Sequence, residues 1–445
     1  MEQPQWQRDL AGSEPLPSLS ASPRALVIDL EGALLRSNLL LEALFSRPGR
    51  MLARFGAGGQ AGMAPLTDIL ARAKIDYAHL PYDADVLNRA LAARARGERI
   101  YLAAGRFEAH AAAIAAHLGF DGVVTSADLA AGDGAAPPFD PRSTGHIADQ
   151  RASRQVGWRI WLRALRVYQY AKNSLVFVPL VTAHQMSPSA LGAALLAFLA
   201  FSACASGAYL MNDLLDLAAD RQHPTKRHRP LAAGDLPIAS ALVAIPLLWL
   251  SALAASLCIS GIFVAVLTGY LVTTVAYSLF LKKKMLLDVV TLAGLYSLRI
   301  VAGAVGVGVV LSEWLLMFSL FVFTSLALIK RFSELTLRQG AGLSDPANRD
   351  YRIGDLQVIA AMAAASGMNA VIVFSLYVSS SAVMSLYSRP WMLWLLNPLL
   401  LYWFGRALMM AHRREMPDDP ILYTFKDNAS RITVVAMISI MLAAI

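Results

Sequence analysis

A series of long apolar stretches, which begins near residue 160 and runs to the end of the chain, constrains the fold most strongly. A transmembrane α-helix needs about 20 consecutive, predominantly apolar residues. Stretches of roughly this length lie at 165–184, 189–211, 237–258, 260–280, 286–309, 312–332, 355–379, 389–410 and 431–445. The chain is 56% hydrophobic, above the usual share of a soluble domain. We therefore expect an all-α polytopic membrane bundle of nine transmembrane helices.

Basic residues gather in alternate loops between these stretches. They follow the second, fourth, sixth and eighth stretches, in groups that include Lys226, Lys283, Arg338 and Arg413. Cytoplasmic loops carry an excess of Lys and Arg, so we expect these loops and the N-terminal region on the cytoplasmic side of a bacterial-type inner membrane. The formal net charge of +8 then indicates contact with anionic lipid and anionic substrate, and we expect no nucleic-acid partner.

Residues 25–130 have a different pattern, in which strand-like runs alternate with helix-like runs. ALVIDL and RIYLAAG are typical of buried strands, and this alternation predicts a small α/β domain. We expect residues 1–24 to be disordered. Residues 131–157, which are rich in Gly and Pro, are expected to form a linker to a membrane domain at 158–445.

The run DLEGALLRSN in this domain resembles the first motif of the haloacid dehalogenase superfamily. In that family an aspartate after a strand is the phosphoryl-accepting nucleophile, and Asp29 takes this position. Glu31 replaces the usual second aspartate, and Ala104 replaces the usual Thr or Ser after the second strand. Phosphoryl transfer also needs a metal clamp and a cation. The resemblance therefore implies a truncated, degenerate domain with a regulatory or docking role.

An acidic cluster follows the second apolar stretch, in NDLLDLAADRQHPTKRHRP at residues 212–230. On a helix, Asp213, Asp216 and Asp220 fall at i, i+3 and i+7 and share one face, with Asn212 one turn before Asp216. Mg²⁺ usually binds one or two carboxylates plus substrate phosphates, so this face suits a metal-bridged diphosphate. The alternative is a solvated helix end. Nearby side chains that can grip a diphosphate are His223, Lys226, Arg227 and Arg229.

A second charged region is YSLFLKKKMLLDVVTLAGLYSLRIVAGA. Asp288 and Arg299 lie eleven residues apart, about three helical turns, so they share a face of an apolar helix. Ionisable groups inside a membrane are costly and indicate function, although a structural pairing of Asp288 with Arg299 is the alternative. Among the three lysines we expect Lys282 to bind substrate. Tyr277 lines either the cavity or a packed interface.

A third charged group lies at the cytoplasmic end of the sixth apolar stretch and consists of Lys330, Arg331 and Glu334. These residues either bind a lipid phosphate or are snorkelling side chains at a helix end. Small residues elsewhere in the apolar stretches, Gly303 among them, permit close approach of helices.

The motif NDxxDxxxD after the second stretch and YSxxLKxxxxxD before the fifth resemble the paired aspartate-rich motifs of the UbiA superfamily of intramembrane prenyltransferases. The resemblance covers residues 160–445. It implies nine helices around a cavity that opens sideways to lipid, with metal-bound phosphates on the cytoplasmic side. The runs DRQHPTKRHRPLAAG, LDVVTLAGLYSLRIVAGA and KRFSEL are most similar to the decaprenyl-phosphate phosphoribosyltransferase-like branch.

This branch implies a Mg²⁺-dependent enzyme with phosphoribosyl diphosphate as donor and a polyprenyl phosphate as acceptor. By resemblance, Asp288 would bind the sugar or a second metal, and Lys172 with Asn173 would meet a phosphate. The residues that would hold Mg²⁺ and the leaving diphosphate are Asn212, Asp213, Asp216 and Asp220, with Lys226, Arg227 and Arg229 on the diphosphate oxygens.

Two other functions are compatible with the same charges. The first is prenyl transfer from a polyprenyl diphosphate to an aromatic or other acceptor, in which the aspartates would support an allylic cation. The second is a membrane transporter, whose substrate site would lie near the midplane between internal repeats. No such repeat is evident, and the charges gather at the cytoplasmic ends of the stretches.

Overall fold

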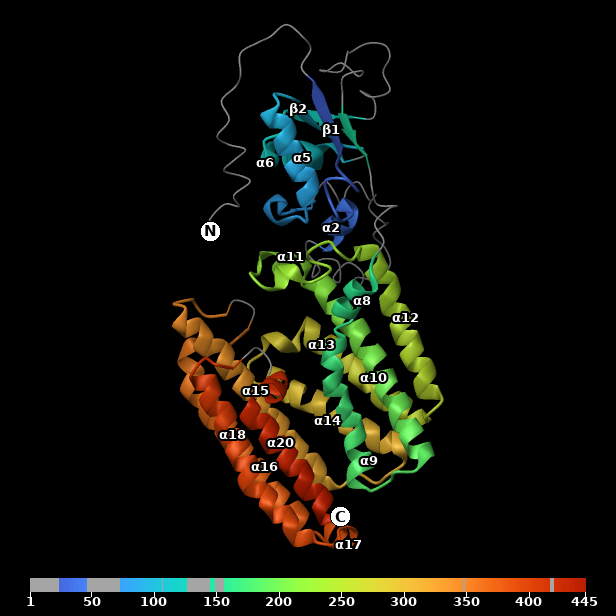
Figure 1. Ribbon diagram of the computed structural model, residues 1–445, viewed down its shortest axis with the longest axis vertical. Helices are drawn as coiled ribbons and strands as arrows, with labels where there is room; N and C mark the ends of the chain where they lie inside the picture. Colours follow the sequence, from blue (N-terminus) through green and yellow to red (C-terminus); the bar gives the residue numbers. More distant parts are fainter. Residues whose placement is uncertain are drawn as a thin grey trace, which may run out of the picture. The chain divides into compact units, whose positions relative to one another are not determined.

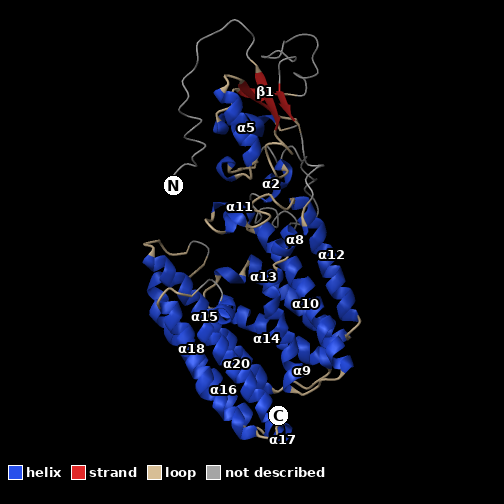
Figure 2. Ribbon diagram, in the orientation of Figure 1, coloured by secondary structure: helices blue, strands red, loops and turns tan. Residues whose placement is uncertain are grey.

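The computed structural model describes residues 24–45, 73–105, 107–125, 145–148, 156–346, 349–416 and 420–445. The chain divides into two compact units. The first unit combines Met1–Arg166 with Tyr209–Pro246, and the second combines Val167–Ala208 with Leu247–Ile445. The sheet belongs to the first unit, and helices make up the second (Figure 2).

The first unit contains a parallel sheet of four strands in the order β3-β2-β1-β4. Figure 1 labels its two central strands, β1 and β2. Parallel strands that are buried on both faces read as continuous apolar runs, and Ile28, Ile100 and Leu102 in the central strands are fully buried. The elements of this part are β1 (Ala25–Asp29), α2 (Leu39–Phe45), α5 (Ala84–Ala95), β2 (Arg99–Ala103), α6 (Glu108–Leu118), β3 (Gly122–Val124) and β4 (Gly145–Ile147).

Strand β4 lies within residues 131–157, which we expected to be a linker. Its residues pair in parallel with β1, with Leu26 opposite Gly145 and Ile28 opposite Ile147. The sheet therefore continues past residue 130, because the exposed edge of β1 is completed by a strand from the expected linker. The structure describes residues 145–148 and 156–157 of this segment. The rest of it lies outside the described residues, as do residues 1–23, which we expected to be disordered.

The haloacid dehalogenase-like positions have structural partners in the sheet. Asp29 ends β1, and its Oδ1 lies 2.9 Å from Nε2 of His146. Glu31 accepts a hydrogen bond from the backbone N–H of Leu39 at 2.8 Å, at the start of α2. A carboxylate that caps a helix in this way satisfies one of its free N–H groups. Glu31 thus has a structural partner at the start of α2.

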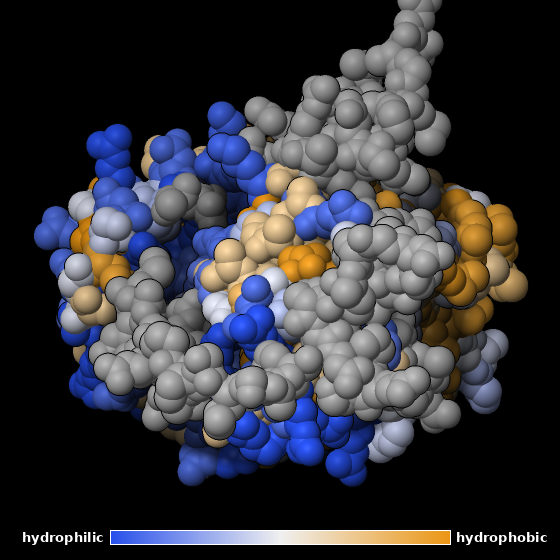
Figure 3. All heavy atoms as spheres, turned by 90° about the horizontal axis from the view of Figure 1, so that it is seen from above, coloured by the Kyte–Doolittle hydropathy of each residue, from blue (hydrophilic) through white to orange (hydrophobic). Residues whose placement is uncertain are grey.

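Seven helices among the described residues are long and apolar enough to cross a membrane. Several of their large apolar side chains are exposed, for example Val243, Leu247 and Leu250 on α12, as expected for lipid-facing positions. Figure 3 shows hydrophobic side chains gathered along the right flank of the view. The seven helices are α10 (Pro188–Leu215), α12 (Ile238–Leu257), α13 (Gly261–Leu279), α14 (Leu287–Val307), α15 (Glu313–Gly340), α16 (Leu356–Val378) and α18 (Leu396–His412).

The first and last of the nine expected helices differ from the sequence expectation. Residues 165–184 do not form one helix. Leu165 caps the end of the preceding helix, α8 (Trp158–Ala164). A 3₁₀ segment (Val167–Phe177) and the short helix α9 (Val178–Thr182) follow. Arg166 has a φ of 53°, and a non-glycine residue in this region interrupts a right-handed helix. The last stretch forms α20 (Asn428–Ala444), a shorter apolar helix of 17 residues.

Helix α14 packs against α13, α15 and α9 within the second unit. A Cβ atom at Gly303 would lie 2.0 Å from the carbonyl oxygen of Val176, so the backbones approach too closely for any side chain. This is the close approach expected from a small residue in a membrane helix. Helices α15, α16, α18 and α20 lie side by side (Figure 1), and α17 (Ser381–Leu386) and α19 (Pro420–Lys426) complete the unit.

Candidate functional site

The aspartate cluster of the first unit lies where α10 gives way to α11 (Leu217–Gln222). Asp216 stands between the two helices, with φ −94° and ψ 7°. Its N–H nevertheless donates to Asn212 at 2.9 Å, and the N–H of Asp220 donates to Asp216 at 2.8 Å. The i to i−4 hydrogen-bond pattern thus continues across the break. The helical spacing assumed from the sequence is preserved through the cluster.

Arg229 brings two of these carboxylates together. Its Nη1 donates to Asp213 Oδ1 at 3.1 Å and to Asp220 Oδ2 at 2.5 Å. Asp213 and Asp220 are both buried. Burial raises the pKa of the Asp220 carboxyl, and the positive charge of Arg229 opposes this rise. Because both carboxylates bond one nitrogen atom, they converge on a common point, as their spacing predicts.

Asp216 is less buried than its two neighbours and accepts a hydrogen bond from Asn212 Nδ2 at 3.1 Å. A carboxylate with an amide partner and partial exposure remains accessible to an incoming ligand. Asn212 and Asp216 therefore lie beside the pair that Arg229 joins.

Arg166 was not identified from the sequence, yet it donates a hydrogen bond to Asp213 Oδ1. Its guanidinium also lies 5.0 Å from the ring centroid of Tyr209, within the range of a cation–π interaction. Arg166 directly follows the C-cap residue of α8, and its backbone has a positive φ of 53°. A single arginine at the start of the first apolar stretch gave little signal, because it belongs to none of the charged motifs.

The remaining cations of HPTKRHRP are exposed. His223 accepts at Nδ1 from the N–H groups of Thr225 and Lys226, at 3.3 and 3.4 Å. Lys226 and Arg227 lie in a short 3₁₀ helix (Lys226–His228). Lys226 is near enough to lower the pKa of Asp220 electrostatically. Arg229, which follows this helix in extended conformation, is the cation of the run that bonds the aspartates.

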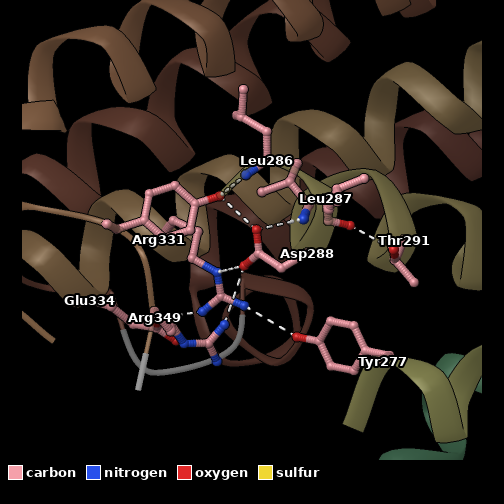
Figure 4. A network of polar contacts seen from close by, with 10 residues as sticks. Tyr277, Leu286, Leu287, Asp288, Thr291, Arg331, Glu334 and Arg349 are labelled. Carbon is pink, nitrogen blue, oxygen red and sulfur yellow. Dashed lines mark hydrogen bonds and ion pairs between the residues drawn. The ribbon is translucent and has the colours of Figure 1, made fainter. Parts of the chain in front are cut away.

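A second polar cluster surrounds Asp288 in the second unit (Figure 4). Asp288 is fully buried in the first turn of α14. Its Oδ2 accepts from Arg331 Nε at 2.7 Å and from Arg349 Nη1 at 3.2 Å. Its Oδ1 accepts from the Tyr351 hydroxyl at 2.6 Å and from the N–H of Val289 at 2.8 Å. Both carboxylate oxygens are therefore occupied by protein donors.

The two arginines of this cluster share a second carboxylate. Arg331 Nη1 donates to Glu334 Oε2 at 2.5 Å, and Arg349 Nε lies 3.9 Å from the same oxygen. Arg331 also lies 3.5 Å from the hydroxyl of Tyr277. Sequence reasoning found Arg331, Glu334 and Tyr277 but missed Arg349 and Tyr351. These two residues lie in a loop whose charges were used only to orient the helices.

Arg299 pairs with groups other than Asp288. Its Nε donates to Asn173 Oδ1 at 2.9 Å, and its Nη2 donates to the Tyr270 hydroxyl at 2.9 Å. Asn173 is itself buried and donates to Ser202 at 3.1 Å. The alternative of an Asp288–Arg299 pairing is thus replaced by the Asp288–Arg331 pair. A shared helix face did not bring these residues together, because residues on other helices supplied closer partners.

Three further predicted binding residues are lysines. Lys172 Nζ lies 5.9 Å from the ring centroid of Tyr296. Lys282 belongs to a short 3₁₀ helix (Leu281–Lys283) before α14 and is half-buried. Lys330 precedes Arg331 on α15 and is half-buried as well. Lys282 and Lys330 retain exposed surface through which they can contact a ligand.

The described residues contain no group of three or more His, Cys, Asp or Glu side chains that could hold a metal ion by themselves. Mg²⁺ commonly takes one or two protein carboxylates and completes its shell with water and substrate phosphates. Asp213, Asp216 and Asp220 fit such a partial site, since Asp213 and Asp220 already converge on a cation. Asp288 fits it poorly, because its oxygens bond two arginines and a tyrosine.

Residues 174–428 match the family model described as the UbiA prenyltransferase family. An uncharacterized protein of Sinorhizobium fredii is 31% identical over 91% of this chain and 88% of its own length. A decaprenyl-phosphate phosphoribosyltransferase of Mycobacterium tuberculosis is 33% identical over 41% of this chain, and the match covers 62% of that protein.

Among solved structures, a UbiA homolog from Archaeoglobus fulgidus bound to GPP and Mg²⁺ aligns with 16% identity and a TM-score of 0.49, over 63% of this chain and 99% of that one. The match to the family model spans more than half of the chain and includes the helices around Asp288. The resemblance inferred from the paired motifs is confirmed, and the transporter alternative loses its support. The chain belongs to the UbiA prenyltransferase family and is a multi-pass membrane transferase.

Proposed function

We propose that this protein transfers the phosphoribosyl group of phosphoribosyl diphosphate to a polyprenyl phosphate, with release of diphosphate. The convergence of Asp213 and Asp220 on Arg229 carries the proposal, because it places carboxylates and a cation where a metal-bound diphosphate can replace internal contacts. The similarity to a protein named decaprenyl-phosphate phosphoribosyltransferase supports this donor and acceptor.

In this proposal Asp213, Asp216 and Asp220 hold Mg²⁺, and Asn212 orients Asp216. The bound ion would neutralise charge that builds on the leaving diphosphate. Arg229 and Arg166 are placed to take up the oxygens of the same leaving group, since both bond Asp213. Charge-assisted bonds from arginine to phosphate are strong and directional. The protein therefore supplies a preorganised site for the charge of the transition state.

The Asp288 cluster serves as the phosphate-binding site of the second substrate or of the sugar. Asp288 and Glu334 hold Arg331 and Arg349 in place, and the exposed part of this cluster lies at Arg349 and Glu334. Lys330, the residue before Arg331 on α15, adds positive charge near Glu334. Asp288 acts here as a positioning residue for two arginines and, with both oxygens bonded to protein donors, does not itself bind the sugar or a second metal in this proposal.

The reaction breaks the bond between the anomeric carbon and diphosphate and forms a bond from that carbon to an oxygen of the lipid phosphate. The electron pair of the broken bond leaves with diphosphate. A lipid phosphate dianion can attack without loss of a proton, so a general base is unnecessary. This agrees with a cluster in which Asp288 is fully engaged with Arg331 and Tyr351.

A screen of donors against acceptors tests the proposal. Purified protein would be supplied with Mg²⁺ and either phosphoribosyl diphosphate plus polyprenyl phosphate, or prenyl diphosphate plus an aromatic acid. The proposal expects diphosphate and a phosphoribosyl lipid from the first pair only. Product from the second pair alone would instead establish prenyl transfer, the other activity that the family description favours.

A further inference from the structure

Arg221, the residue after Asp220, is buried against a carboxylate of the α/β domain. Its Nη1 and Nη2 donate to the two carboxylate oxygens of Glu42 at 2.5 and 2.7 Å, which makes the pair bidentate. Glu42 belongs to α2, and both side chains are less than a tenth exposed. Arg221 Nε also donates to the carbonyl of Ala232 at 3.1 Å. The guanidinium of Arg221 thus connects α11 both to α2, through Glu42, and to the loop that follows Arg229, through Ala232.

Further contacts connect the same two segments within the first unit. Arg36 Nη1 donates to Asp235 Oδ1 at 3.2 Å, and Gln222 Nε2 donates to Asp76 Oδ2 at 3.1 Å. A Cβ atom on Gly234 would lie 2.8 Å from Cβ of Arg36. Gly234 also has a φ of 73°, a conformation that favours glycine. The α/β domain therefore contacts the chain on both sides of Arg229.

These contacts enclose the residues of the aspartate cluster. Asp220 directly precedes Arg221, and Arg229 lies three residues before Ala232, whose carbonyl Arg221 holds. A shift of α11 relative to the chain after Arg229 would change the distance between Asp220 and Arg229. A planar guanidinium bound on two sides resists such a shift, because its fork geometry fits a carboxylate in one orientation.

We propose that the N-terminal α/β domain is a built-in clamp on the aspartate segment, and that Glu42 is a positioning residue for Asp220 and Arg229. Glu42 acts through Arg221 and does not touch substrate. This gives the degenerate domain a specific task that needs no phosphatase chemistry. The inference rests on the proposed function only in that the aspartate cluster binds a metal ion with diphosphate.

The test compares full-length Glu42→Gln with Glu98→Gln, which makes the same substitution in an ion pair with Arg96 on the surface of the same domain. Three properties are measured in detergent: hydrogen exchange of residues 209–236, Mn²⁺ binding by electron paramagnetic resonance, and the kinetics of transfer. Outer-shell partners of metal sites typically change metal affinity or activity about 10- to 100-fold. We expect Glu42→Gln to speed exchange in 209–236 and to weaken Mn²⁺ binding by roughly tenfold.

Kinetics should show a raised KM for the diphosphate donor and a smaller change in kcat, and Glu42→Asp, which keeps the charge, should recover part of the loss. Glu98→Gln should match the wild type in every property. If Glu42→Gln speeds exchange in residues 209–236 but leaves the Mn²⁺ affinity unchanged, the domain docks without positioning the site. If exchange in residues 209–236 is unchanged, the domain does not hold this segment. Either result overturns the proposal.

If Glu42→Gln fails to fold, Arg36→Ala provides the second variant, since Arg36 is partly exposed and lies outside the Glu42–Arg221 pair. It should speed exchange around Asp235, and an unchanged exchange rate there would contradict the proposal. Hydrogen exchange and Mn²⁺ binding do not depend on which donor the enzyme uses. A wrong choice of substrate would therefore leave both readouts intact, so the two proposals can fail separately.

Discussion

Arg331 Nε donates a hydrogen bond to Asp288 Oδ2 across 2.7 Å, and both side chains are almost completely buried. Arg349 bonds the same oxygen. The aspartate of the second motif thus lies in a cluster with two arginines and Glu334, in which acidic and basic charges balance. From the first turn of α14 it bonds Arg331 of α15 and Arg349 of the loop that follows α15.

Asp288→Asn should destabilise the protein strongly, because it leaves the buried Arg331 without its full counter-charge. Breaking a buried ion pair by removal of one partner costs about 3–5 kcal/mol. Thermal unfolding in detergent measures this cost, with the exposed Asp350→Asn as the matched control. The double variant Asp288→Asn, Arg331→Met should recover part of the lost stability. Normal unfolding of Asp288→Asn with altered Mg²⁺ activation would instead identify Asp288 as a metal ligand.

Arg229→Ala should lower turnover more than Arg227→Ala. Arg229 bonds both Asp213 and Asp220, whereas Arg227 is exposed and contacts His228. Loss of a donor that stabilises developing charge commonly costs about 10²- to 10³-fold in kcat. We expect a loss of this order for Arg229→Ala and a loss below about tenfold for Arg227→Ala. Equal losses in steady-state kinetics would show that the exposed cations carry the binding.

Gly303→Ala should destabilise the membrane bundle, because its new Cβ would collide with the Val176 carbonyl. Overpacking of this kind typically costs about 1–3 kcal/mol. Gly294→Ala is the matched control on the same helix, since among the described residues no atom outside its chain neighbours and its own helix backbone lies within 4 Å of its Cβ position. Thermal unfolding of the two variants should differ clearly. A similar melting temperature for both would contradict the close approach at Gly303.

Asp427 gives the protein an acid-sensitive contact. Hydrogen bonds from Arg406 hold the pKa of this carboxyl well below its ordinary value of 3.8, despite the opposing effect of burial. A lowered pKa stabilises the fold above the ordinary value, and this stabilisation is lost as the pH falls through the pKa of the folded state. Asp427→Asn should therefore melt earlier than the wild type at about pH 6, and the difference should shrink below about pH 4. A difference that is independent of pH would contradict the ion pair.

The general architecture and the aspartate cluster could be predicted from local sequence. Apolar length identified the seven spanning helices, and the spacing of Asp213 and Asp220 placed both carboxylates on one side of the segment. The same rule of length failed at residues 165–184, because most of this apolar run forms the 3₁₀ segment Val167–Phe177 and only Val178–Thr182 is α-helical, a difference that apolar composition does not reveal.

The partners of Asp288 could not be predicted in the same way. Arg331 and Arg349 are separated from it by 43 and 61 residues, whereas helical periodicity relates only residues on one helix. It pointed to Arg299, which instead contacts Asn173 and Tyr270 from neighbouring segments. Contacts between helices depend on the angles at which the helices pack and on the length of the side chains. The hydropathy pattern of the sequence does not determine these packing angles or contacts.

Diphosphate release by the wild type and by Asp213→Asn is the most direct test of the account. The protein would be given Mg²⁺, phosphoribosyl diphosphate and a polyprenyl phosphate, with chelation of the metal as a second condition. The account predicts release by the wild type, loss of release on chelation, and a fall of at least about 100-fold in Asp213→Asn. Release that survives in Asp213→Asn, or that needs no divalent metal, would contradict the claim that the aspartate cluster binds the metal-bound diphosphate.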